Sequence, residues 1–154
     1  MSKLVEQTAP ASALLPQYRA LLETVDTLPL AVTGSSMLPF LAPGRDSVVL
    51  TRLKNPPKRG DIVLYQRESG AYVLHRVYAV QAGGSCCMVG DAQQELEHGI
   101  RPEQMIAVVC AARRKGRVQR PGVFWWEFFS KIWIRLVPLR PFLLRVYQIG
   151  RRSA

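Results

Sequence analysis

Residues 62–81 read IVLYQRESGAYVLHRVYAVQ, two β-rich apolar runs joined by a Ser69-Gly70 turn. Short runs bounded by turn residues in this way are typical of β-strands. Further runs of the same kind occur on both sides, with tight connections and no helical pattern between them. We therefore expect a mainly β fold built on a largely antiparallel sheet. The predicted strands are Leu30–Thr33, Ser47–Leu53, Ile62–Gln66, Tyr72–Gln81, Cys86–Val89 and Met105–Ala112, with one short strand after Arg117.

Helical patterns flank this β-rich region. Apolar residues recur at helical spacing between Leu14 and Val25, which predicts an N-terminal amphipathic helix of about four turns. Residues 123–137 and 142–149 predict a pair of C-terminal amphipathic helices, separated by a break at two prolines. The expected organisation is an N-terminal helical segment (1–28), a β domain (29–119) and a basic, aromatic-rich helical tail (120–154).

The length and charge of the chain limit the possible functions. A chain of 154 residues with 48% hydrophobic residues fits one compact domain. Its net charge of +10 lies in the tail, because residues 113–154 hold eleven Lys and Arg against Glu127 alone, while residues 1–112 are neutral. These cations stand among bulky apolar side chains, which disfavours a nucleic-acid partner. We expect the neutral body to be soluble without the tail.

The tail has the composition of an element that lies on a membrane surface. Tryptophan and phenylalanine rings alternate with cations such as Lys131 and Arg135, as in helices at the headgroup level of anionic bilayers. The alternative is a helix buried against the β domain with its arginine heads reaching solvent. The sequence predicts neither a signal peptide nor a transmembrane helix. It therefore predicts a peripheral protein of the cytoplasmic membrane, on the cytoplasmic face.

The cysteines do not suggest a disulfide framework or a metal site. Cys86 and Cys87 are adjacent and Cys110 is a third, which favours a reducing compartment. There is no CxxC pair, and His75 and His98 are the only histidines. We expect neither a metal nor a cofactor.

A serine turn follows the first predicted strand, in the sequence Val32-Thr33-Gly34-Ser35-Ser36-Met37-Leu38-Pro39. Small residues around a serine allow a bend that turns its hydroxyl outward and leaves its own N–H free as a donor to an oxyanion. Taken alone, a Ser-Ser pair is more often only a turn. The segments that follow it favour a catalytic role.

Three further segments follow in order: Lys58-Arg59-Gly60-Asp61-Ile62-Val63-Leu64-Tyr65, then Tyr72-Val73-Leu74-His75-Arg76-Val77, then Val89-Gly90-Asp91. Together with the serine turn they resemble the serine-peptidase superfamily that holds type I signal peptidases and self-cleaving LexA-like repressors. The resemblance covers about half of the chain, from Val32 to Val109. It is closest to the archaeal and endoplasmic-reticulum branch, in which a histidine replaces the lysine base.

The resemblance implies a role for each matching residue. The serine before the methionine, Ser36, would be the nucleophile, His75 the general base and Asp91 the third catalytic residue. Histidine suits this task because its ordinary pKa is already close to neutral. Glu97 stands near a position where the family commonly has an acid, so the third member stays open between Glu97, Asp91 and none, and Asp91 could equally shape its own turn. Met37 and Pro39, beside the serine, are expected at the substrate site.

The sequence therefore predicts a serine endopeptidase that cleaves a peptide or precursor protein bound as an added strand. The resemblance implies a small side chain before the cleaved bond. One alternative is a degenerate peptidase fold that binds a peptide at the membrane without cutting it. Another is a LexA-like self-processing regulator, which is disfavoured because no Ala-Gly pair precedes the serine and the N-terminal segment is too short for a helix-turn-helix domain.

Overall fold

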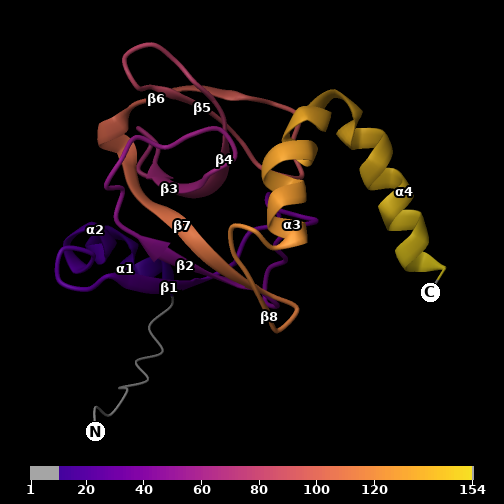
Figure 1. The fold of residues 1–154 in the computed structure, drawn as a ribbon, viewed down its shortest axis with the longest axis horizontal. Coiled ribbons are helices and arrows are strands. Elements are labelled where there is room, and N and C mark those ends of the chain that lie inside the picture. The colour runs from indigo at the N-terminus through magenta and orange to yellow at the C-terminus, as the bar shows by residue number, and fades with distance from the viewer. Residues whose placement is uncertain (1–10, 154) are drawn as a thin grey trace, which may run out of the picture.

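The computed structural model describes residues 11–153, which form one eight-stranded antiparallel sheet flanked by helices (Figure 1). The mainly β fold predicted from the sequence is confirmed. Along the sheet the order is β1-β2-β7-β3-β4-β5-β6, and β8 pairs with β7. The strands are β1 (Thr27–Ala31), β2 (Ser47–Thr51), β3 (Ile62–Gln66), β4 (Tyr72–Val80), β5 (Cys86–Val89), β6 (Glu97–Ile100), β7 (Met105–Arg114) and β8 (Arg117–Gln119).

The central strand β3 explains how the sheet buries both of its faces. Ile62 and Leu64 point into the larger core, whereas Val63 and Tyr65 point into a second, smaller core. Successive side chains of a strand point to opposite faces, so a strand covered on both faces is apolar throughout. The larger core also takes residues from β1, β2 and β7 and from helices at both ends of the chain.

The described part of the N-terminal segment is less regular than the single helix we predicted between Leu14 and Val25, and it ends earlier, at Leu21. It consists of α1 (Ala11–Leu14), a 3-10 turn (Leu15–Gln17) and α2 (Tyr18–Leu21). Pro16 lies in the 3-10 turn and has no N–H to continue an α-helical ladder. Tyr18 and Leu22 are buried in the larger core, so this segment is part of the same domain.

The C-terminal region divides into a packed half and an exposed half. A helical stretch runs through α3 (Phe124–Glu127), a π-helical turn (Phe128–Ile132) and a 3-10 stretch (Trp133–Leu139), and then turns into α4 (Arg140–Arg152). Phe129 and Trp133 belong to the larger core. The body before residue 120 therefore shares its larger core with side chains from the C-terminal region, which argues against the expectation that it would be soluble alone.

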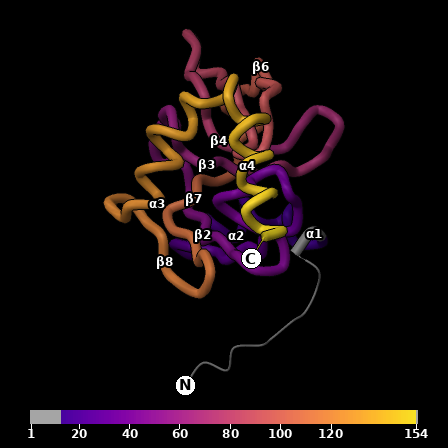
Figure 2. The backbone as a smooth tube through the Cα atoms, turned by 90° about the vertical axis from the view of Figure 1, so that its right-hand side faces the viewer, coloured from indigo at the N-terminus to yellow at the C-terminus, as the bar shows by residue number. Residues whose placement is uncertain are grey.

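Helix α4 lies on the outside of the molecule. In Figure 1 it runs back from the end of the packed stretch, separate from the sheet. In Figure 2, which is turned by 90°, it lies in front of the rest of the chain. No helix of residues 11–153 has the length and hydropathy needed to cross a bilayer.

Candidate active site

Ser36 and His75 line the same cavity, of about 330 Å³. Ser36 comes from the loop after β1, and His75 comes from β4. The rest of the lining combines apolar side chains such as Leu64 and Leu74 with polar ones, among them Arg67. Ser35 is exposed and is not part of the lining. Of the two adjacent serines, only Ser36 is thus placed to meet a molecule in this cavity.

The Gly90-Asp91 turn after β5 supports the serine loop from behind. The Ala92 N–H donates a hydrogen bond to the Ser36 carbonyl oxygen at 2.9 Å. The approach is so close that a Cβ atom on Gly90 would lie 2.5 Å from the same oxygen. Glycine is needed here because two backbone segments touch, a reason distinct from its freedom to adopt positive φ. The glycine of the third segment thus fixes the position of the serine.

His75 lies in a chain of buried hydrogen bonds. It is 3% exposed, and its Nδ1 is 3.3 Å from the Tyr65 hydroxyl. The Tyr65 hydroxyl in turn donates to Glu97 Oε2 at 3.0 Å. Arg67 closes the chain with hydrogen bonds from both Nε and Nη2 to the Glu97 carboxylate.

The direction of these bonds fixes the tautomer of His75. The Arg67 guanidinium holds the pKa of Glu97 below its ordinary value, so this carboxylate can only accept hydrogen bonds. Tyr65, whose pKa is raised by burial, keeps its single proton and donates it to Glu97. Its oxygen must therefore accept from the Nδ1–H of His75. The second ring nitrogen, Nε2, is then left with a free lone pair.

Burial also determines the charge of His75. Loss of water around the ring, together with the nearby Arg67, lowers the pKa of His75 to about 4. The imidazole is therefore neutral at physiological pH. A neutral ring with a free Nε2 is the form that can take a proton from a serine hydroxyl.

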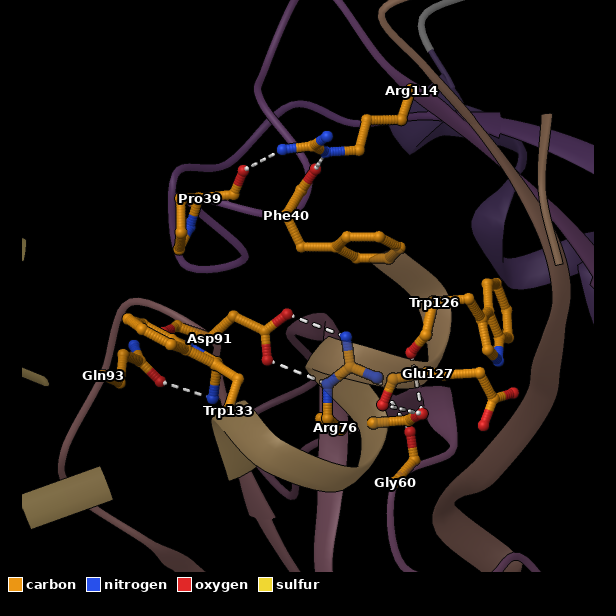
Figure 3. Close-up of polar contacts among 12 residues, drawn as sticks. Pro39, Phe40, Gly60, Arg76, Asp91, Gln93, Arg114, Trp126, Glu127 and Trp133 are labelled. Carbon is orange, nitrogen blue, oxygen red and sulfur yellow. Dashed lines mark hydrogen bonds and ion pairs between the residues drawn. The ribbon is translucent and has the colours of Figure 1, made fainter. Parts of the chain in front are cut away.

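Asp91 has a different partner from the one implied by the family resemblance. Its carboxylate accepts two hydrogen bonds from Arg76, at 2.9 and 2.8 Å, in a fully buried ion pair (Figure 3). Arg76 also donates to the Gly60 carbonyl and lies under the Phe40 ring. Asp91 thus ties the turn behind Ser36 to β4, and its carboxylate is not hydrogen-bonded to His75. Of the two acids considered from the sequence, Glu97 is the one connected to His75.

The C-terminal region holds the same turn from its other side. The Trp133 indole N–H donates to the Asp91 carbonyl at 2.8 Å. Arg140 is fully buried and donates to the carbonyls of Gly90, Gln93 and Trp133. The segment that supports Ser36 is therefore fixed by side chains from beyond residue 120.

The two residues expected at the substrate site lie in different places. Met37 is buried and lines the cavity beside Ser36. Pro39 is not part of the lining; its carbonyl, like that of Phe40, accepts a hydrogen bond from Arg114 (Figure 3). Met37 is placed to contact a bound molecule, and Pro39 belongs to the support of the loop.

Two further features describe the state of the site. Within residues 11–153, no hydrogen bond joins Ser36 to His75, and the Ser36 N–H has no acceptor. The same part of the chain contains no group of three His, Cys, Asp or Glu side chains suited to a metal ion. The three cysteines are free thiols.

Tyr65 and Arg67 are the site residues that sequence reasoning missed. A usable signal was present in the β3–β4 hairpin, where Val63 pairs with His75 and Tyr65 pairs with Val73. This register puts Tyr65 diagonally across from His75 on one face of the sheet.

Comparisons with protein-family models, with curated proteins and with solved structures found no match to this chain.

Proposed function

We propose that this protein is a serine endopeptidase that uses a Ser36–His75 dyad, of the kind found in the signal-peptidase and LexA-like superfamily. The observation that carries the proposal is the shared cavity, in which Ser36 faces the same space as a neutral His75 whose Nε2 is free to accept a proton. The four ordered sequence segments support the same assignment independently.

The chemistry follows from these groups. The Ser36 hydroxyl oxygen attacks the carbonyl carbon of the peptide bond while His75 Nε2 takes its proton. The negative charge that forms on the carbonyl oxygen is stabilised by the Ser36 N–H. When the C–N bond breaks, His75 returns the proton to the leaving amine. Water then hydrolyses the acyl ester with the same base, which regenerates Ser36.

The Tyr65–Glu97 pair supplies the positioning that a third catalytic residue often supplies. It fixes the Nδ1–H tautomer and, through Glu97, places a negative charge near the imidazolium that forms during attack. Tyr65 and Glu97 are thus positioning residues that act through His75.

A peptide substrate fits the surroundings of the cavity. β1 is the terminal strand of the sheet, and among the described residues no other strand pairs with its outer edge. Residues 30–34 at this edge line the cavity. An extended peptide that pairs with an exposed strand edge is held by its backbone, with side chains inserted into the cavity at alternate positions.

The test is cleavage of a mixture of synthetic peptides by the full chain, with products identified by mass spectrometry. We expect cleavage by the unaltered protein and by Ser35→Ala, and a loss on the order of 10³-fold or more for Ser36→Ala and for His75→Ala, since the two residues act as a unit. Circular dichroism checks that each variant is folded. Full activity of Ser36→Ala, with loss in Ser35→Ala, would show that we have assigned the wrong nucleophile.

A peptide-binding module that does not cleave is the second candidate. It is favoured by the missing hydrogen bond between Ser36 and His75 and by the low pKa of His75, which makes the ring a weak base. Catalytic hydrogen bonds are often long in unliganded enzymes and shorten when substrate binds, so the missing hydrogen bond does not decide against the peptidase. Peptides retained by the protein but never cut would decide for the binding module.

A further inference from the structure

Helix α4 carries an apolar stripe that the other residues of the described part of the chain leave uncovered. Phe142, Val146 and Ile149 follow one another at spacings of four and three residues, so they lie along one face of the helix. They are 68%, 54% and 64% exposed. The side of the helix that faces the body is a different one, since Arg140 is buried and Leu144 is half-buried against the larger core.

Cations flank this stripe, and no acid balances them. Arg145 and Arg152 follow the residues of the stripe on the same helix and are exposed. No acidic residue occurs after Glu127, whose own carboxylate is paired with Lys131. Among residues 11–153, neither Arg145 nor Arg152 forms an ion pair.

We propose that α4 docks onto the surface of an anionic lipid bilayer. In this arrangement Phe142, Val146 and Ile149 enter the boundary between headgroups and acyl chains. Arg145 and Arg152, with their flexible stems, keep their charges among the lipid phosphates. The helix lies in the plane of the membrane and does not cross it.

The charge argues for a bilayer over a second copy of this chain. Two copies joined along this stripe would bring their arginines together, and the resulting repulsion is strong in a protein with a net charge of +10. A single stripe on a helix of 13 residues also offers little area compared with the ~800 Å² that each partner contributes to a standard interface. An anionic surface matches both the apolar stripe and the cations beside it.

The proposal is tested by co-sedimentation of the full chain with vesicles of phosphatidylcholine, with or without phosphatidylglycerol. We expect binding to the anionic vesicles and weaker binding at high salt, because salt screens the arginines. The double variant Arg145→Gln, Arg152→Gln should bind the anionic vesicles more weakly by about fivefold per lost cation. The double variant Phe142→Ser, Ile149→Ser should lose about tenfold or more per side chain.

A matched control is the double variant Arg117→Gln, Val118→Ser, which removes one cation and one exposed apolar side chain from β8. We expect it to lose no more than about fivefold, the effect of a single cation. Thermal unfolding of all variants checks that they are folded. The proposal is overturned if the full chain does not bind anionic vesicles or binds neutral vesicles equally well. It is also overturned if the α4 variants bind anionic vesicles as tightly as the control variant does. A dimer in sedimentation velocity that the Phe142→Ser, Ile149→Ser variant loses would assign the stripe to a second copy and would also overturn it.

Discussion

The most informative residue of the site is His75, because its surroundings determine both its charge and its tautomer. Burial holds its pKa in the folded chain at about 4, against an ordinary value of 6.5. Tyr65 and Glu97 hold its proton on Nδ1. These two properties make a specific prediction for the pH dependence of the proposed peptidase activity.

We expect the acid limb of kcat/KM for peptide cleavage to fall at about pH 4, because protonated His75 cannot accept the Ser36 proton. Its pKa is lower in the folded than in the unfolded chain, so His75 contributes stability that is complete above about pH 6.5 and is lost as the pH falls through about 4. ¹⁵N NMR of the histidine ring measures the same pKa directly and reports which nitrogen carries the proton. A limb above about pH 8 would point to lysine as the base.

The variant Tyr65→Phe tests the tautomer with the same measurement. It removes the acceptor of the Nδ1–H, so the preference for this tautomer should weaken. We expect kcat to fall by roughly ten- to a hundredfold, at most the lower end of the ~10²–10⁴-fold that general base catalysis contributes, because His75 itself remains. Tyr78→Phe is the matched control on β4, since Tyr78 contacts Arg59 and takes no part in the chain of hydrogen bonds. An unchanged ¹⁵N spectrum in Tyr65→Phe would contradict the assigned direction of the hydrogen bonds.

At the scale of elements, the turn after β5 is as important as the serine loop that it supports. Gly90→Ala would place a methyl group 2.5 Å from the Ser36 carbonyl oxygen, so one of the two segments must move. Such overpacking costs about 1–3 kcal/mol, which lowers the melting temperature by several degrees.

The same variant should also reduce activity. A shift of the nucleophile by about 1 Å can cost up to ~10²-fold in rate, so we expect peptide cleavage by Gly90→Ala to fall at least tenfold. Gly150→Ala is the control, because nothing lies within 4 Å of the added methyl group. Cleavage and thermal unfolding of both variants are compared with the unaltered protein, and full activity of Gly90→Ala would show that the turn does not position Ser36.

Local patterns predicted the elements well where burial dictates the residue type. The apolar runs of β3 and β5 are fully or almost fully buried, and their predicted boundaries match the structure. The strand β6 was missed because three of its four residues are polar or glycine and only Ile100 is buried. The N-terminal segment was predicted as one regular helix because its apolar spacing is helical throughout, whereas Pro16 interrupts the α-helical ladder with a 3-10 turn.

The candidate site was predictable only in part, for a related reason. The proposed nucleophile and base stand in recognisable local sequence, so Ser36 and His75 could be chosen before the structure. The partner of a buried charge depends on which strands are neighbours, and the sequence alone did not show that Asp91 would meet Arg76 while Glu97 would reach His75 through Tyr65. Such contacts across the sheet are set by register, which single residues do not reveal.

For the whole molecule, the C-terminal region divides at Leu144. Residues up to Leu144 complete the core and hold the turn behind Ser36, whereas none of the described residues beyond Leu144 belongs to either core. A chain that ends at Leu144 should therefore unfold cooperatively at nearly the same temperature as the full chain and retain peptide cleavage. It should lose binding to anionic vesicles, because Val146, Ile149 and the last arginines are gone.

A chain that ends at Gln119 should behave differently. It loses Phe129 and Trp133 from the larger core, and removing a large buried aromatic side chain costs about 3–5 kcal/mol. Two such losses are comparable to the whole stability of a domain, about 5–15 kcal/mol. The truncation also removes Trp133 and Arg140, whose hydrogen bonds hold the turn behind Ser36. We expect this chain to show no cooperative thermal transition, and a transition like that of the full chain would mean that the sheet folds without its C-terminal cover.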